Sequence, residues 1–173
     1  MKRNIITLLI TVFAMLQATA QTYDNLWKQA DIIAQKDQPK SEIGVMKKII
    51  SKATAAKDYG QLLAAEIRQA ILWREISPDS LTPNVKRMEA AALNAKDPVL
   101  KAVRYAVLGK VYREVNGKKS EEFFKKALEQ PELLAKHTST EYVPLTLKGV
   151  DGSSFNNDLL HLIGFEADSK EAY

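Results

Sequence analysis

Apolar residues in segment 59–76 fall on two separate arcs when the segment is projected as an α-helix at about 100° per residue. Polar residues form one unbroken line, Gln61, Arg68 and Glu75. A helix with two apolar sides must be covered by other elements on both of them. The pattern therefore predicts a central helix within an all-helical layer. The arcs are Tyr59, Leu63, Ile67, Ala70 and Ile71 on one side, and Leu62, Ala65, Leu72, Trp73 and Ile76 on the other.

Helical spacing predicts a pair of helices before the central one. The first runs over about 22–36, and the second begins at Pro39, because the missing N–H of a proline costs nothing in a first turn. Gly60, in the first turn of the central helix, indicates a bend or the close approach of a neighbouring backbone. The first pair forms a helical hairpin whose second helix carries Ile43, Met46, Ile49, Ile50 and Ala53 on one face.

A stop and a cap separate the central helix from a fourth one. Residues 77–80, Ser-Pro-Asp-Ser, end the central helix, and Thr82 is expected to cap the next helix with Pro83 at its first position. The predicted buried side of this helix is small, which implies close packing: Val85, Met88, Ala92 and Ala95.

The same kind of local signal marks a fifth and a sixth helix. Asp97 and Pro98 repeat the cap-then-proline arrangement before a helix over 99–115. The Asn-Gly pair at 116–117 is a strong break, and Ser120 is expected to cap the sixth helix. Apolar positions are Val103, Ala106, Val107, Leu108, Val111 and Tyr112 in the fifth helix, and Phe123, Phe124, Ala127 and Leu128 in the sixth.

The segment 131–154 has a different character. Its prolines, glycine and serines predict an extended, turn-rich connection, and its apolar residues indicate that it packs against the helices. A last helix is expected over 157–167 with Asn156 as its cap. The apolar residues of the connection are Leu133, Leu134, Tyr142, Leu145 and Leu147.

The order of these elements predicts an all-α protein. We expect helical hairpins stacked as a short TPR-like (tetratricopeptide-like) α-solenoid, with an irregular segment before the last helix. The third and fifth helices start about forty residues apart, which is in the range of helical repeats. Residues 21–173 are expected to form this helical-repeat domain, incomplete at its C-terminal end because 169–173 resemble the opening of a helix that the sequence does not finish.

The first twenty residues are typical of a secretory signal peptide. Lys2 and Arg3 give a charged start, 5–16 form an apolar run too short for a comfortable membrane span, and Ala-Thr-Ala at 18–20 is a small-residue cleavage site. The alternative is an uncleaved anchor. Cleavage predicts a periplasmic or secreted protein of the cell envelope with no stable membrane span.

Charge and cysteine content narrow the class of function. Cleavage would remove Lys2 and Arg3 and lower the formal net charge from +4 to +2. The remaining excess of lysine is interpreted as spread along the helices, which does not indicate a nucleic-acid partner. The sequence has no cysteine, and this excludes a disulfide, a thiol nucleophile and a thiolate metal site.

No group of residues predicts catalysis, a cofactor or a metal site. His137 and His161, the two histidines, lie in dissimilar contexts and show no acidic residues at metal-ligand spacing. The oxygen-rich segment 151–158 has its glycine at the second position, whereas a calcium loop has it at the sixth, so a turn is favoured. Glu66 lies between the two apolar arcs and is expected to form a salt bridge to a neighbouring helix, with Arg104 as its candidate partner.

Six aromatic residues at helical spacing allow two interpretations. They form part of the core, or they line a concave peptide-binding surface of the kind that helical repeats provide. These possible protein-contact or core residues are Tyr23, Trp27, Tyr59, Trp73, Tyr105 and Tyr112.

Several short segments resemble the helical N-terminal region of large exported alpha-2-macroglobulin-like proteins of Bacteroidota. The resemblance implies a cell-envelope protein related to protease-trapping macroglobulins, whose N-terminal helices precede β-sandwich domains. The sequence departs from that pattern because it ends at Tyr173 and, without cysteine, has no thioester, so we expect no trapping by this chain alone. The matching segments are Tyr23-Asp24-x-Leu26-Trp27, Asp37-x-Pro39-x-Ser41, the run from Lys57 to Leu63, the run from Ile76 to Ser80, Tyr142-x-Pro144-Leu145, and Asp158-Leu159-Leu160-His161-x-Ile163-Gly164.

The resulting functional hypothesis is a non-catalytic, exported helical-repeat module that mediates protein–protein contacts in the cell envelope. The alternative is a structural spacer, or a vestigial fragment without its own partner. An enzyme of the glycosidic-hydrolase type is a third class, and it would require two carboxylates facing one cleft.

Overall fold

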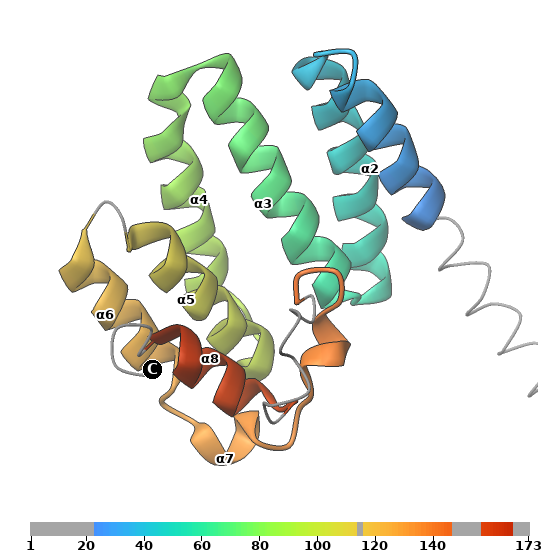
Figure 1. Cartoon of the computed structure of the whole chain (residues 1–173). Coiled ribbons are helices and arrows are strands. Elements are labelled where there is room, and N and C mark those ends of the chain that lie inside the picture. Colours follow the sequence, from blue (N-terminus) through green and yellow to red (C-terminus); the bar gives the residue numbers. More distant parts are fainter. Residues whose placement is uncertain (1–22, 114–115, 147–156, 168–173) are drawn as a thin grey trace, which may run out of the picture.

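Short breaks between amphipathic segments turn the chain back on itself, and the result is a stack of neighbouring helices (Figure 1). The computed structural model describes residues 23–113, 116–146 and 157–167. All regular elements in these ranges are helical, so the predicted all-α fold is confirmed. The elements are a helix over 23–34, α2 (Pro39–Ala56), α3 (Tyr59–Ile76), the 3-10 helix η1 (Pro78–Ser80), α4 (Leu81–Leu93), α5 (Pro98–Tyr112), α6 (Gly117–Ala127), α7 (Pro131–Leu134), the 3-10 helix η2 (Ser139–Tyr142) and α8 (Leu159–Ala167).

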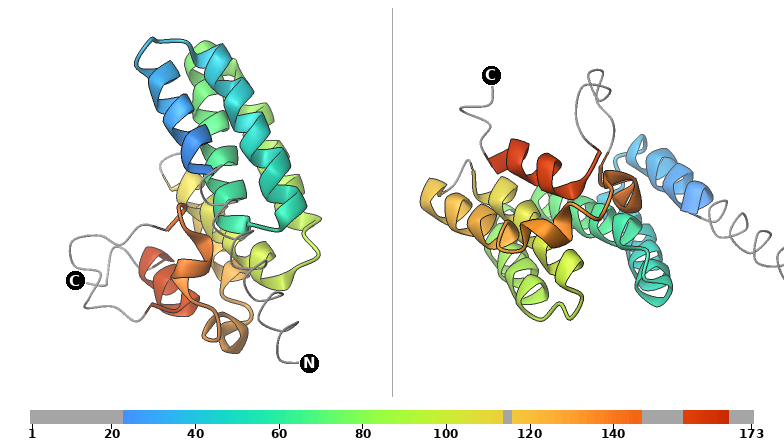
Figure 2. Two further views of the ribbon diagram at one scale, coloured as in Figure 1. Left: turned by 90° about the vertical axis from the view of Figure 1, so that its right-hand side faces the viewer. Right: turned by 90° about the horizontal axis from the view of Figure 1, so that it is seen from below.

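The helices lie on two sides of the pair formed by α3 and α5. Helices α2 and α4 lie on one side, whereas the 23–34 helix and α8 lie on the other (Figure 2). The closest neighbours are α2 with α3, α5 with α6, and α4 with α5. Across the described ranges, none of the helices combines the length and the apolar composition that a membrane span requires.

The central helix α3 is covered on both sides, as its two apolar arcs predict. Leu62, Ala65 and Leu72 pack into a core shared with the 23–34 helix and α2. Leu63 belongs to a second core, built with α5, α6 and the C-terminal segment. Ile71 is an exception, because 42% of its surface is exposed although it lies on a predicted apolar arc.

The predicted buried face of the second helix is confirmed. Met46, Ile49 and Ala53 are completely buried, and Ile43 is nearly so. The break after this helix has no proline; a left-handed residue ends α2 and a side-chain cap begins α3. Lys57 adopts a left-handed conformation with φ 55°, and the Asp58 carboxylate then accepts a hydrogen bond from the N–H of Gln61 at 3.2 Å.

The cap predicted at Ser120 is wrong. Helix α6 begins at Gly117, and Asn116 caps it by accepting a hydrogen bond from the N–H of Lys119 at 3.1 Å. Ser120 is instead buried inside α6, where its hydroxyl donates to the carbonyl oxygen of Gly109 in α5 at 2.7 Å. The Phe124 ring of α6 also lies directly over Gly109, where a Cβ atom would collide with it. The small size of Gly109 and Ser120 therefore lets the two helices approach closely.

Two other predicted caps also lie in the wrong place. The 3-10 helix η1 runs directly into α4, which begins at Leu81, so Thr82 lies inside the helix while Pro83 remains in its first turn. Helix α8 begins at Leu159, two residues later than predicted, because Asp158 accepts a hydrogen bond from the N–H of His161 at 2.9 Å. The predicted cap Asn156 lies outside the described residues.

The connection after α6 is partly helical, which corrects the prediction of an extended segment. Residues 131–146 form α7 and η2, and the bonds of these short turns satisfy backbone groups that an extended chain would leave unpaired. The predicted packing against the helices is confirmed, because Leu134 and Tyr142 are buried. The rest of this connection, the signal peptide predicted over 1–20 and the unfinished helix predicted over 169–173 lie outside the described residues.

The 3-10 helix η2 contacts the first turn of α3 at Gly60. A Cβ atom at Gly60 would lie 2.5 Å from the carbonyl carbon of Tyr142 and 2.8 Å from its oxygen. The close approach of a neighbouring backbone at this glycine is therefore confirmed. The Tyr142 side chain joins the same core as Leu63 of α3 and Val103 of α5, so this contact fixes the C-terminal segment over the helices.

Replacing Gly60 with alanine should destabilise the protein. The added methyl group meets backbone atoms that cannot rotate away, so we expect a loss of about 1–3 kcal/mol in the free energy of unfolding. Gly44, in the middle of α2, has open space around a Cβ and provides the matched control. Gly44→Ala should stabilise the protein by up to about 1 kcal/mol through helix propensity. Urea denaturation measures both, and a Gly60→Ala variant as stable as Gly44→Ala would contradict the contact.

Burial raises the pKa of the Tyr142 hydroxyl far above its ordinary value, with the nearby Asp97 carboxylate as a second cause. Because the folded state holds the neutral phenol, its contribution to stability is complete below the unfolded pKa of about 10 and is lost as the pH rises further. Above that pH the wild type should lose up to about 1.4 kcal/mol per pH unit relative to Tyr142→Phe. Urea denaturation from pH 8 to 11.5 tests this, and parallel curves for the two proteins would refute it.

Candidate functional site

The six candidate aromatic residues pack against the cores of the protein. Tyr23, Trp27 and Trp73 pack around the first hairpin and α3, and Tyr112 packs around α5 and α6. Tyr59 and Tyr105 each contact one of these cores and also the core that α3, α5, α6 and the C-terminal segment share. Tyr23 is only 4% exposed, and the others are half-buried. All six therefore contribute to packing, and the five half-buried ones also keep part of their surface exposed.

Direct contacts show how two groups of these aromatics are used. The Trp27 ring N–H donates to the Gln61 side chain at 2.6 Å and links the 23–34 helix to α3. In the other core, the Phe123 ring stacks with Tyr105 and with Tyr112, at centroid distances of 6.0 and 5.5 Å. Such pairs add stability beyond the area that they bury.

Glu66 pairs with Arg104, the partner that its place between the apolar arcs predicts. The two side chains form a bidentate salt bridge between α3 and α5, with distances of 2.6 and 3.1 Å. The side chain of Arg104 is 10% exposed and that of Glu66 is 26% exposed. The space beside this pair is only about 10 Å³, which is about the size of one water molecule, so it is no ligand pocket.

A second ion network explains the polar line on α3. Arg68 bonds to Glu42 of α2 at 2.5 Å and to Asp31 at 2.9 Å. Glu42 is 2% exposed, so its charge depends on this partner. Burial opposes the charged form, but the hydrogen bonds to Glu42 and Asp31 raise the pKa of Arg68. The line that the sequence shows as a polar face is therefore largely an inter-helix contact.

Each histidine has an acidic partner, which the sequence prediction missed. His137 contacts Glu141 at 2.8 Å, and the hydrogen bond lowers the pKa of that carboxyl. His161 contacts Asp158 at 2.8 Å, and its hydrogen bonds overcome burial and lower the pKa of the Asp158 carboxyl. The i,i+4 and i,i+3 spacings were the available signal. Within the described ranges, the acidic and histidine side chains form no group of three that would hold a metal ion.

A network of Glu89, Tyr112 and Lys119 connects α4, α5 and α6. The Tyr112 hydroxyl donates to Glu89 at 2.7 Å, and the Lys119 ammonium group lies 3.1 Å from the same carboxylate. The bond from Tyr112 lowers the pKa of Glu89, while burial and the Glu89 carboxylate raise the pKa of Tyr112. Each of the three polar groups bonds to the other two, so the network holds the three helices together.

An open depression of about 220 Å³ lies at the junction of α5, α6 and α7. Its floor contains Ala102, Ala127 and Leu134, which are buried, and Tyr105 and Leu133 form its walls. Pockets for small-molecule ligands measure roughly 300–1,000 Å³, so this depression accommodates a single side chain better than a whole ligand. It was not predicted, because its lining comes from three elements whose packing the sequence does not specify.

The rim of this depression is charged. Lys101 and Lys126 border it together with Glu129, giving two positive groups and one negative group. The Lys126 ammonium group lies 5.4 Å from the centre of the Phe123 ring and 5.9 Å from that of Tyr105. These cation–π contacts hold the lysine over the aromatic wall. The depression thus combines an apolar floor with a net positive rim.

The chain matches no protein-family model, no curated protein and no solved structure at a significant level.

Breaking the Glu66–Arg104 bridge from one side should be costly. In Glu66→Ala the Arg104 guanidinium group is left largely buried and unpaired, so we expect a loss of about 3 kcal/mol in the free energy of unfolding. Glu66→Leu combined with Arg104→Met replaces both charges by apolar groups and should recover most of that loss. Urea denaturation of both variants provides the comparison. A single variant that costs less than about 1 kcal/mol would mean that the pair behaves like an exposed one.

Proposed function

We propose that this protein is a non-catalytic, exported helical-repeat module that mediates protein–protein contacts in the cell envelope. The observation that carries the proposal is the depression between α5, α6 and α7 on an otherwise tightly paired helical stack. A helical stack that presents a small concave feature suits the capture of a side chain from another protein.

The lining of the depression favours a particular kind of contact. An apolar side chain would bury its surface against Ala102, Ala127 and Leu134. A carboxylate next to that side chain would lie between Lys101 and Lys126. The partner segment is therefore expected to present an apolar residue beside an acidic one. Charges at such a rim act mainly on the rate and specificity of association.

The non-catalytic part of the proposal is supported by the use of the charged residues. Glu66 and Arg104 neutralise each other between α3 and α5, and Arg68 neutralises Glu42. A catalytic acid or base needs a position within hydrogen-bond reach of a substrate, and these groups are held by their partners.

The cellular location is supported by sequence features. Lys2 and Arg3, the apolar run over 5–16 and the small residues at 18–20 favour export. The resemblance to the helical N-terminal region of alpha-2-macroglobulin-like envelope proteins favours the same compartment. The alternative, a structural spacer or a vestigial fragment, differs in predicting that no surface of the stack has its own partner.

Site-specific crosslinking in the producing cells separates these alternatives. A photo-crosslinking amino acid at Gln130, on the rim of the depression, should give a discrete protein adduct. The same group at Lys118, an exposed position of α6 that does not line the depression, serves as the matched control and should give none. No adduct from either position would support the spacer and contradict the proposal.

The captured partner then allows a quantitative test. A peptide from the crosslinked region should bind the purified protein, and Lys101→Glu with Lys126→Glu should weaken this binding about tenfold or more, since two favourable charges become repulsive. Lys118→Glu with Lys125→Glu makes the same change in net charge on exposed positions of α6 and should leave the affinity nearly unchanged. Isothermal titration calorimetry measures both variants, and equal weakening in the two would refute a role for the depression.

A further inference from the structure

Helix α2 and its two ends form a segment with a net positive charge. Residues 36–57 include six lysines and two acidic residues, which matches the formal net charge of +4 for all 173 residues. Basic residues also exceed acidic ones elsewhere, as in 101–126 with eight against three, so α2 is distinguished by how its lysines are placed in the folded structure.

The folded structure separates the two signs of charge within this segment. The Glu42 carboxylate is 2% exposed and bonds to Arg68 of α3, so it faces the core. Lys40, Lys47 and Lys48 are exposed on the opposite side of α2, and none of the ion pairs found among the described residues involves them. The outer face of α2 consequently has lysines and no acidic residue.

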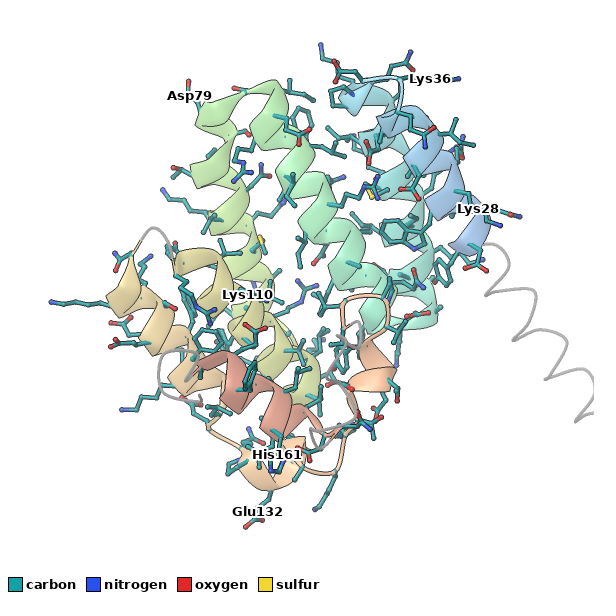
Figure 3. All side chains as sticks on the ribbon, in the orientation of Figure 1. Lys28, Lys36, Asp79, Lys110, Glu132 and His161 are labelled. Atoms are coloured by element: carbon teal, nitrogen blue, oxygen red, sulfur yellow. The ribbon has the colours of Figure 1, made fainter. Side chains whose placement is uncertain are left out.

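The lysines share this face with small residues only. Ser41, Gly44, Ser51, Thr54, Ala55 and Ala56 are the other exposed positions of α2. At about 100° per residue, the three lysines and all of these positions except Ala56, at the last turn, occupy one arc of less than half of the helix. Further lysines extend the face at both ends. Lys36 points away from the body of the molecule at the turn before α2 (Figure 3), and Lys57 follows the last turn.

The composition of this face distinguishes between two kinds of anionic partner. Protein interfaces are enriched in tyrosine, tryptophan and arginine at their centre and depleted in lysine. The outer face of α2 has no aromatic residue, no arginine and no large apolar side chain. Lysines retain their hydration and act as point charges without directional bonding. This combination suits a diffuse anionic surface, such as lipid headgroups, better than a specific acidic protein.

We propose that the outer face of α2 rests on an anionic phospholipid surface, held by attraction between its lysines and the headgroup phosphates. The small residues keep the face flat, so Lys40, Lys47 and Lys48 reach the surface together. No residue of the face inserts into the hydrocarbon layer. This contact is independent of the depression between α5, α6 and α7, which involves other helices.

Simple electrostatics gives the expected strength. Each lysine close to an anionic membrane contributes about fivefold to the partition coefficient. Reversing three of them should therefore weaken binding by more than about a hundredfold. The attraction is screened by salt, because the Debye length falls from about 10 Å at 0.1 M to about 3 Å at 1 M.

Vesicle sedimentation with the exported protein purified from its own cells tests the proposal. The probe is vesicles of phosphatidylglycerol and phosphatidylcholine in equal parts, with pure phosphatidylcholine as the neutral comparison. We expect binding to the anionic vesicles only, and loss of that binding at 1 M salt. The triple variant Lys40→Glu, Lys47→Glu, Lys48→Glu should lose it at low salt, with helicity by circular dichroism unchanged.

A matched variant excludes a mere effect of net charge. Lys86→Glu, Lys118→Glu and Lys125→Glu change the charge by the same amount at exposed positions of α4 and α6. The partition coefficient of this variant for the anionic vesicles should be at least about a tenth of the wild-type value. The partition coefficient of the α2 variant should be well below that. Equal losses in the two variants, or no wild-type binding to anionic vesicles, would overturn the proposal. Binding to an acidic protein or to duplex DNA without binding to vesicles would overturn it as well.

Discussion

The coverage of α3 on both sides is the constraint on which the rest of the structure depends. One apolar arc of this helix packs on the first hairpin, and Leu63 on the other side enters the core of α5, α6 and the C-terminal segment. Neither core would be closed without it, because each takes one side of the same helix. Gly60 makes this position possible, since the backbone at Tyr142 lies where any larger residue would place its side chain.

Several charged residues in this protein join neighbouring helices. The Glu66–Arg104 bridge connects α3 with α5, Arg68 connects α3 with the first hairpin, and Glu89 joins α4 with α5 and α6. Buried pairs of this kind contribute less to net stability than to the specificity of one arrangement, because desolvation offsets most of the attraction. The two surfaces proposed above for recognition, the depression at α7 and the outer face of α2, do not use these paired groups. They differ in chemistry: one is small and apolar with a charged rim, and the other is cationic with small residues between its lysines.

Several features followed from the sequence because their causes are local. The bounds of α3 and the Asp97 cap with Pro98 depend on residues within one or two turns. The same holds for the buried face of α2. The Gly60 contact and the Glu66–Arg104 pair could be predicted for another reason. Because α3 is covered on both sides, a glycine in its first turn indicates a close neighbouring backbone, and a carboxylate between its apolar arcs indicates a salt bridge to another helix. Predictions failed where two local signals compete. Asn116 and Ser120 are both residue types that cap helices well. Asn116 is the cap in the structure, and the Ser120 hydroxyl instead donates to the carbonyl oxygen of Gly109 in α5.

By itself, then, the sequence determined that the chain is helical, where α2, α3 and α5 begin, and which sides of α2 and α3 are apolar, because periodicity and capping act over a few residues. Only the tertiary structure decided which helices are neighbours, how the 131–146 segment folds onto α3, and that the depression forms between α5, α6 and α7. It also decided that Glu42 faces the core and pairs with Arg68 of α3. These outcomes depend on contacts between residues far apart in the chain, and such contacts leave no periodic trace in the sequence.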